Sequence, residues 1–278
     1  MDLLDLHKTL LEIAKDFDSL CTENHISYYL MGGSALGAIR HKGFIPWDDD
    51  FDVFMDAENY YRFLSLAESK LDKNRYHLQK EDSLEWPLFF SKLRLNGTTF
   101  IEPNTRDSNI HQGIFIDVMC LHNVFENPIL RRLQFGSALL LTAYSLRRRG
   151  YEFNSGYIKK LFIILAGFID TAGLKPILFK FVRCLDNNNT NYVGHFFGKA
   201  NFNKTSFPQE WLGKPRYVPF GETFLPVPEK VEHYLKLRYG NNYMDLPDEK
   251  TLSMYPAHAS FFDTQRNYTE YLTKNDSL

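Results

Sequence analysis

A pair of aspartates has the residue type and the spacing of a divalent-cation site. Asp50 and Asp52 are two residues apart in a segment typical of a β-strand, so their side chains point to the same face. Phe51 and Val53 point to the other face and can anchor the strand in a core. Two ionised carboxylates a few ångströms apart repel, and each raises the pKa of the other unless a cation or a proton intervenes. Because carboxylate oxygens are hard ligands, the pair predicts a site for Mg²⁺ or Mn²⁺ rather than for zinc.

A third carboxylate stands alone in an apolar segment. Asp117 is the only charged residue in the run GIFIDVM, residues 113–119. A buried carboxylate is costly unless it meets a cation, a hydrogen-bond donor or a metal, and an arginine could serve as well as a metal. If the strand of Asp117 lies beside that of Asp50 and Asp52, the three carboxylates form a triad able to hold two metal ions. An acidic triplet such as 48–50 is by itself more often a solvated loop, so the prediction depends on the combination.

Helices and strands alternate over the first 126 residues and must position these aspartates. Apolar residues at three- and four-residue steps predict an amphipathic helix over residues 1–24. The dipeptide Asn96-Gly97 predicts a hairpin between residues 89–95 and 98–102. The other predicted elements are a strand over 26–30, a helix from Ser34, a strand over 51–55, a helix over 57–71 and a strand over 113–119.

The chain changes character after residue 126. Residues 127 to about 185 are helical, apolar and basic, and the last third returns to strands and turns rich in proline and aromatic residues. This order predicts an α+β fold with a mixed sheet, flanking helices and a helical insertion. We expect a catalytic core over 1–126, the insertion over 127–190, and a part over 191–278 that completes the core and the substrate site.

Composition and charge exclude several classes of protein. The 278 residues include 32 Lys and Arg against 34 Asp and Glu, a net charge of −2, which argues against a nucleic-acid-binding protein held by bulk electrostatics. Three well-separated cysteines suggest neither a disulfide framework nor a structural zinc site. The acidic N-terminus is unlike a signal peptide, and no segment reaches the roughly 20 apolar residues of a membrane span. We therefore expect a cytoplasmic protein.

One long stretch carries a family resemblance. Residues 30–52, LMGGSALGAIRHKGFIPWDDDFD, resemble the signature of the LicD family, bacterial phosphocholine transferases related to the fukutin-type ribitol-phosphate transferases. Residues 91–94 with 98–100 resemble the second strand pair of the family, and residues 239–247, YGNNYMDLP, resemble its C-terminal element. The resemblance covers about 25–119 and 215–258. Gly-Gly-Ser stands where many relatives have Gly-Thr-Leu.

The resemblance implies a fold, an activity and a set of site residues. The fold is that of the nucleotidyltransferase superfamily, and the activity is metal-dependent transfer of phosphocholine from CDP-choline, or of a similar CDP-alcohol phosphate, to a sugar hydroxyl, with release of CMP. Two Mg²⁺ or Mn²⁺ ions are held by Asp50, Asp52 and Asp117, and Asp117 or Asp48 takes the hydroxyl proton. Candidate phosphate partners are Gly33, Ser34, Arg40, His41, Lys42, Lys92 and Arg94. For Lys92 and Arg94 an exposed cationic strand face is an equal alternative.

The acceptor and several aromatic residues remain open. The resemblance implies a teichoic acid, lipopolysaccharide or capsular glycan on a lipid carrier. Residues 129–183 combine apolar helices with arginines and lysines, which suits either peripheral contact with the inner face of an anionic membrane or an internally packed helical subdomain. Trp47 could stack on the cytosine of the donor or belong to the core, and we expect His111 and His258 to be structural.

Two further functions compete with phosphocholine transfer. The first keeps the fold and the metal but uses ribitol or glycerol donors, or acts as an NTP-dependent nucleotidyltransferase on a small molecule. The second is a non-catalytic binding module. The crowded carboxylates argue against the second function, because a protein without catalysis has no use for their mutual repulsion.

Overall fold

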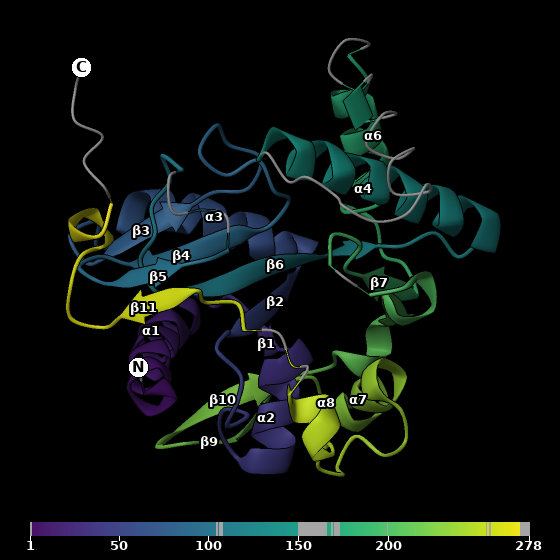
Figure 1. The fold of residues 1–278 in the computed structure, drawn as a ribbon. Helices are drawn as coiled ribbons and strands as arrows, with labels where there is room; N and C mark the ends of the chain where they lie inside the picture. Colours follow the sequence, from purple (N-terminus) through teal and green to yellow (C-terminus); the bar gives the residue numbers. More distant parts are fainter. Residues whose placement is uncertain are drawn as a thin grey trace.

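The computed structural model describes residues 2–103, 105, 108–149, 166, 167, 169, 173–198, 200–253, 255 and 257–272. The fold is mixed α/β, with a curled mixed sheet and helices around it (Figure 1). The helices are α1 (Leu3–Glu23), α2 (Gly32–His41), α3 (Ala57–Lys70), α4 (Pro128–Arg148), α6 (Leu174–Val182), α7 (Val231–Tyr239) and α8 (Glu249–Ser253). The strands are β1 (Tyr29–Leu30), β2 (Asp52–Asp56), β3 (Tyr76–Gln79), β4 (Ser91–Leu95), β5 (Thr99–Ile101), β6 (Phe115–Asn123), β7 (Tyr192–Gly194), β8 (Ser206–Pro208), β9 (Arg216–Phe220), β10 (Thr223–Val227) and β11 (Phe261–Asp263).

The central sheet places the two predicted acidic strands side by side. Its strand order is β1-β2-β6-β4-β3, and β7 joins the far end of β6 and carries β8. β2 and β6 run parallel, and their register sets Asp52 directly opposite Asp117. The strand pairs on either side of them are antiparallel. Carboxylates 65 positions apart in sequence therefore share one edge of the sheet.

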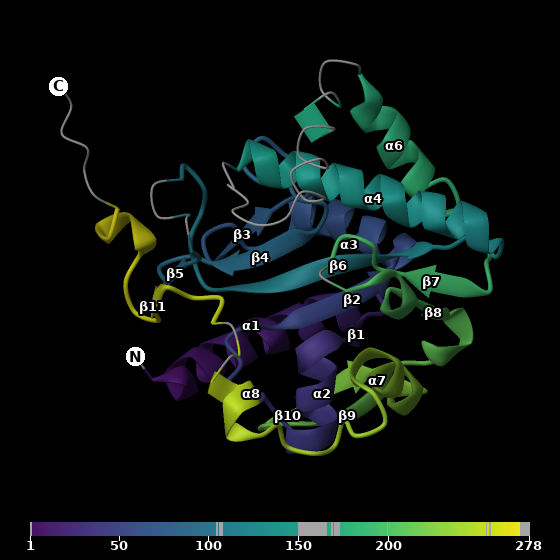
Figure 2. The same cartoon turned by 45° about the vertical axis from the view of Figure 1, so that its right-hand side comes forward.

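Local sequence signals explain the helices that cover this sheet. The apolar stripe of α1 is buried, and the Asp2 carboxylate caps the helix by accepting a hydrogen bond from the Leu4 N–H. Asp56 ends β2 and caps α3 by accepting from the Asn59 N–H. Both helices pack against β6 in one large core. Figure 2 shows α2, α7 and the β9–β10 ribbon grouped beside the β1 edge.

The predicted hairpin around Asn96-Gly97 is wrong. The chain does turn there, with Gly97 at a φ of 75°, but β4 and β5 do not pair. Both edges of β4 are already occupied, by β3 and by β6. β5 pairs instead with β11 near the C-terminal end of the chain. The turn signal was correct, but the neighbouring strands had better partners elsewhere.

The predicted helical insertion contains two described helices that pack against each other. Ala138, Leu141 and Val182 are buried between α4 and α6. The buried Gln134 amide donates to the Asn123 and Val182 carbonyls, which ties both helices to the end of β6. Residues 150–165, 168 and 170–172 of this region lie outside the described residues. Among the described helices, none is long and apolar enough to cross a bilayer.

Candidate active site

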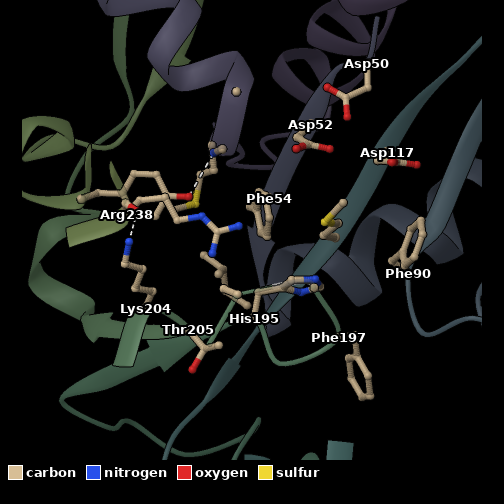
Figure 3. A pocket seen from close by; sticks show the side chains of 18 of the residues that line it. Asp50, Asp52, Phe54, Phe90, Asp117, His195, Phe197, Lys204, Thr205 and Arg238 are labelled. Carbon is tan, nitrogen blue, oxygen red and sulfur yellow. Dashed lines mark hydrogen bonds between the residues drawn. The ribbon is translucent and has the colours of Figure 1, made fainter. Parts of the chain in front are cut away.

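A pocket of about 350 Å³ lies along the β2–β6 pair. Alternate residues of a strand share a face, so Asp52 and Phe54 of β2 line it together, beside Asp117 and Met119 of β6. Figure 3 shows Asp50, Asp52 and Asp117 at one end and His195, Arg238 and Lys204 at the other. The pocket therefore has an acidic end, formed by Asp48, Asp50, Asp52 and Asp117, and an end walled by apolar and cationic residues.

Several carboxyl groups of the acidic end have raised pKa values, because simultaneous ionisation of buried neighbouring carboxylates is unfavourable. Burial and the neighbouring Asp50 carboxylate raise the pKa of Asp48 to about 8. Burial raises the pKa of Asp52 well above its usual range, and the charges of Asp50 and Asp117 act in the same direction. Burial also raises the pKa of Asp117, to about 6, although Lys92 opposes the shift. An added positive charge would stabilise all of these groups in their ionised form.

Two adjacent glycines let the start of α2 approach these carboxylates. Gly32 has a φ of 61°, a left-handed conformation, and a Cβ built on it would lie 2.9 Å from Asp52 Oδ2. A Cβ on Gly33 would lie 2.6 Å from Asp48 Oδ2. Both distances are shorter than a carbon–oxygen contact allows. The Gly-Gly pair is therefore required by the close packing of backbone against the acidic end.

The Ser34 hydroxyl contacts the backbone of β2. Its hydroxyl oxygen accepts a 2.8 Å hydrogen bond from the backbone N–H of Asp52, and the side chain does not line the pocket. The hydroxyl thus holds β2 against α2 and fixes the start of the strand that carries Asp52. The serine positions a site residue, and phosphate binding by its hydroxyl is not supported.

The cationic group after the glycines lies away from the pocket. The Arg40 guanidinium donates to the carbonyls of Tyr243 and Asp245, which anchors the C-terminal element, and its Nε donates to His41 Nε2. The carbonyl of Lys42, a residue in left-handed conformation after α2, accepts from the Gly221 N–H. Arg40, His41 and Lys42 do not line the pocket, so their prediction as phosphate partners is not supported.

Lys92 and Arg94 are buried, which excludes the alternative of an exposed cationic strand face. Lys92 is 2% exposed and lines the pocket, and its Nζ lies 3.3 Å from both Asp117 Oδ1 and Glu102 Oε1. The contact with Asp117 is an ion pair without the geometry of a hydrogen bond. Arg94 is 1% exposed, donates to Gln79 and the Gly113 carbonyl, and does not line the pocket. Lys92 belongs to the site, and Arg94 supports the sheet beneath it.

His258 belongs to the acidic end, contrary to the prediction that it is only structural. Its Nδ1 lies 2.9 Å from Asp49 Oδ1 and 3.3 Å from Asp50 Oδ2. Asp49 also accepts backbone hydrogen bonds from His258 and Ala259, so this carboxylate anchors the C-terminal segment. Nothing in the spacing of residues 49 and 258 could have indicated this contact, because it depends on the return of the chain to β11.

The opposite wall contains residues that the sequence analysis missed. Lys204, Arg238, Tyr234 and His195 line it. The Tyr234 hydroxyl accepts from the Gly32 N–H at 3.0 Å, which fixes α7 beside the start of α2. Arg238 directly precedes the element YGNNYMDLP and Tyr234 lies four residues before Arg238, so the family resemblance pointed to this neighbourhood without naming these residues.

Trp47, whose role the sequence left open, and His111, which we expect to be structural, both lie outside the pocket. Trp47 packs against the core and does not line the pocket, so stacking on a cytosine there is not supported. His111 stacks on His77 and is also outside the pocket, as expected for a structural residue.

The donor set at the acidic end fits a divalent cation. Oxygens of Asp48 and Asp50 and a nitrogen of His258 lie within 4.8 Å of one another. Asp48 Oδ1 and Asp117 Oδ1 are buried without a hydrogen-bond partner in the described part of the chain. Oxygen-rich ligand sets of this kind suit Mg²⁺ or Mn²⁺. Together with the raised pKa values, the buried Asp48 Oδ1, which has no hydrogen-bond partner among the described residues, indicates that these residues fit a cation.

A second group of metal-ligating side chains is explained by hydrogen bonds. Cys120, His122 and Asp186 also bring ligand atoms within 4.8 Å. Here Asp186 Oδ2 already accepts from His122 Nδ1 and from the Tyr61 hydroxyl, both at 2.9 Å. The Asp186 carboxylate is thereby satisfied, so this group is a buried polar network at the end of β6.

Comparisons with known proteins agree with the resemblance. The family model described as "LicD/FKTN/FKRP, nucleotidyltransferase domain" matches residues 25–112. The chain is 27% identical over 243 residues to a Haemophilus influenzae protein named lipopolysaccharide cholinephosphotransferase LicD, a match that covers 86% of this chain and 90% of that protein. Two uncharacterized proteins match shorter stretches. That of Rickettsia typhi is 42% identical over 21% of this chain and 19% of its own length, and that of Rickettsia prowazekii is 47% identical over 16% of this chain and 17% of its own length. Residues 25–112 thus match the LicD family model, and the chain is similar over most of its length to a LicD protein.

Proposed function

We propose that this protein transfers phosphocholine from CDP-choline, or the phosphate of a related CDP-alcohol, to a hydroxyl of a cell-surface glycan, with release of CMP. The relative from Haemophilus influenzae, matched over most of both chains, is named for cholinephosphate transfer to lipopolysaccharide. One structural observation carries the proposal. Four aspartates and Lys92 share a pocket whose opposite wall presents Lys204 and Arg238, an arrangement suited to a metal-bound diphosphate.

The acidic end supplies the metal ligands in this proposal. Asp50, Asp52 and Asp117 would hold Mg²⁺ or Mn²⁺, with Asp48 and His258 within ligand distance of Asp50, and the cation would neutralise phosphate charge and favour attack at phosphorus. Lys92 holds Asp117 in place from the side away from solvent. The start of α2, with Gly32 and Gly33 against the carboxylates of Asp52 and Asp48, forms one side of the acidic end.

The acceptor hydroxyl must lose its proton as it attacks the phosphorus next to choline, while the bond from that phosphorus to the CMP oxygen breaks. Asp48 and Asp117 are both candidates for the base. Lys92 at 3.3 Å reduces the basicity of Asp117, whereas Asp48 Oδ1 is buried and accepts no hydrogen bond in the described part of the chain. Asp48 is therefore our preferred proton acceptor.

The decisive experiment measures which nucleotide is released. Purified protein with Mg²⁺ is incubated with CDP-choline, CDP-ribitol, CDP-glycerol and CDP-ethanolamine, each with and without teichoic acid, lipopolysaccharide or capsular glycans. We expect glycan-dependent CMP release, largest with CDP-choline. Pyrophosphate release from an NTP with no CMP from any CDP-alcohol would instead establish the nucleotidyltransferase alternative.

The proposal assigns a different role to each of three segments of the chain. A nucleotidyltransferase-like core over 1–126 is supported by the parallel β2–β6 pair with its opposed aspartates. Residues 191–278 complete that core, since β7 pairs with β6 and β11 with β5. The helical part over 127–190 is left to bind the acceptor.

We also propose that the helical part touches the inner face of the membrane. Ile129, Leu133 and Ile177 are 66%, 55% and 63% exposed, so α4 and α6 present several large apolar side chains to solvent. Several of the predicted cations face the protein instead: the Arg131 guanidinium lies over Tyr192 and that of Arg149 over Trp86. The apolar side chains, more than the arginines, support the membrane contact.

A further inference from the structure

The cationic corner of the pocket consists of Lys204 and Arg238. Arg238 is half-buried and lines the same pocket as the four aspartates of the acidic end. No hydrogen bond or ion pair joins its guanidinium to another side chain in the part of the chain that the structure describes. A half-buried guanidinium with five donors and no acceptor has lost hydration without gaining a partner.

A second cation meets Arg238 at this corner. Lys204 Nζ donates to the Arg238 carbonyl at 2.9 Å, so the ammonium group is held at the C-terminal end of α7. His195, on the same wall, adds no charge, because burial lowers its pKa to about 3. Figure 3 shows Arg238 reaching toward His195 and Phe54, with Lys204 beside it. Lys204 and Arg238 thus add two positive charges to one wall of the pocket, and an anion bound there would be attracted to both.

The helix places Arg238 in a fixed relation to the acidic end. Tyr234 lies four residues earlier on α7, and residues at i and i+4 share one face of a helix. The Tyr234 hydroxyl is hydrogen-bonded to the Gly32 N–H, next to the glycine–carboxylate contacts. Arg238 therefore stands one turn, about 6 Å along the axis, from the point where α7 is attached to the acidic end. Because Arg238 and the four aspartates line one pocket, a metal-bound ligand with two linked phosphate groups can extend from the acidic end toward Arg238.

We propose that Arg238 binds the diphosphate of the nucleotide donor, with Lys204 as a supporting cation. This inference rests on the proposed function and assigns the phosphate-binding role to α7 instead of the cations that follow the glycines. A guanidinium offers two parallel N–H groups to a phosphate, which a single ammonium cannot do. Arg238→Lys should therefore restore only part of the affinity that Arg238→Met removes.

The test compares binding of CDP, cytidine and inorganic pyrophosphate by calorimetry in the presence of Mg²⁺. We expect Arg238→Met to weaken CDP and pyrophosphate binding by about tenfold or more, the usual size of a charged hydrogen bond, and to leave cytidine binding unchanged. Lys236→Met is the matched control, because it removes one positive charge from an exposed position of the same helix outside the pocket. Thermal melting of each variant verifies that it is folded.

Three other results of the binding measurements would contradict either the role of Arg238 or the proposed function. Equal CDP affinities for the wild type, Arg238→Met and Lys236→Met would overturn the inference while leaving the proposed function intact. Equal losses in Arg238→Met and Lys236→Met would show a general effect of charge and would also overturn it. Failure of the wild type to bind CDP or pyrophosphate at all would refute the proposed function itself.

Discussion

Asp52 is the residue with the least favourable electrostatic environment in the pocket. Burial and the carboxylates of Asp50, Asp117 and Asp48 raise the pKa of Asp52. The nearby Lys92 ammonium acts in the opposite direction. We expect Asp52→Asn and Asp50→Asn to abolish nearly all CMP release, because each removes a metal ligand. Asp48→Asn should lose about 10²–10⁴-fold, the usual contribution of a general base.

Asp245→Asn is the control for these aspartate variants, since the side chain is exposed and outside the pocket. CMP release at saturating Mg²⁺ and donor is the measurement. Small and equal losses at positions 48, 50 and 52 would contradict the assignment of the acidic end as the catalytic centre.

Replacement of Gly33 by alanine is expected to change turnover without changing thermal stability. Alanine favours a helix over glycine by about 1 kcal/mol, so Gly33→Ala should leave the melting temperature within a few degrees of the wild type. Its Cβ would lie 2.6 Å from Asp48 Oδ2 and must displace that carboxylate, so we expect turnover to fall at least tenfold.

Gly136→Ala on α4 is the matched control for Gly33→Ala, because a Cβ there meets nothing within 4 Å. Its turnover should equal that of the wild type. If Gly33→Ala also retained full turnover, the close approach of α2 to Asp48 would have no bearing on catalysis.

The acidic residues could be predicted from sequence, whereas the cationic ones could not. Two aspartates separated by one residue on a strand must share a face, so Asp50 and Asp52 follow from the period of a strand alone. Arg40 is seven residues after Gly33, which on a helix is about 10 Å along the axis, so it stands at the end of α2 away from the pocket. The short distance in sequence between Gly-Gly-Ser and Arg40 therefore did not mean that Arg40 lies at the pocket. Arg238 and His258 come from distant segments that only the tertiary fold brings in.

At the scale of elements, the contact between α2 and β2 depends on one hydroxyl group. Ser34→Ala would leave the N–H of Asp52 without its acceptor, which should lower the free energy of unfolding by about 1–3 kcal/mol. Chemical denaturation measures this change, and Ser34→Thr, which keeps the hydroxyl, should recover most of it.

Ser137→Ala provides the comparison for this variant. Ser137 is also buried, but its hydroxyl donates only to the Leu133 carbonyl of its own helix, so its removal leaves no backbone group unpaired. We expect a loss below about 1 kcal/mol. Comparable losses at positions 34 and 137 would mean that the Asp52 N–H finds another acceptor.

Element positions followed from local patterns more reliably than strand pairing did. The predicted helices over 1–24 and 57–71 correspond to α1 and α3, whose apolar stripes are buried. The predicted strand over 51–55 corresponds to β2. The hairpin failed because pairing is decided by competition among all strands. The partner of Ile101 is Phe261, 160 positions later, and no local pattern or turn signal marks the two as neighbours.

At the scale of the whole molecule, His195 makes stability depend on pH. Its pKa is lowered by burial to about 3, so the unfolded chain binds a proton that the folded chain does not between about pH 6.5 and pH 3. This histidine therefore makes the free energy of unfolding fall as the pH is lowered through that window, by up to about 1.4 kcal/mol per pH unit. The raised pKa values of Asp48 and Asp117 act in the opposite direction.

The comparison of wild type with His195→Gln isolates the histidine, because the aspartates are common to both. We expect the difference in unfolding free energy between the two proteins to change steadily between about pH 6.5 and pH 4.5 and to stay constant from about pH 7 to pH 8. Denaturation curves at each pH measure it. A difference that does not vary with pH would show that His195 is protonated equally in both states.

The proposed membrane contact depends on exposed apolar side chains of the helical part. Replacement of Ile129 and Leu133 by serine removes exposed apolar area without touching a buried contact, so the variant should fold normally. We expect it to lose flotation with anionic liposomes that the wild type retains. Leu84→Ser, at a position 92% exposed and outside the helical part, is the control. Equal flotation of all three proteins would remove the membrane hypothesis.

The return of the C-terminal segment to the front of the molecule has a consequence for biosynthesis. Asp49 receives its hydrogen bonds from His258 and Ala259, and β5 receives its strand partner from residues 261–263. A nascent chain will have made every aspartate of the centre long before the segment that braces them emerges from the ribosome. Until then, like charges lie close together without these contacts, so the site cannot be complete before residues 258–263 have been translated.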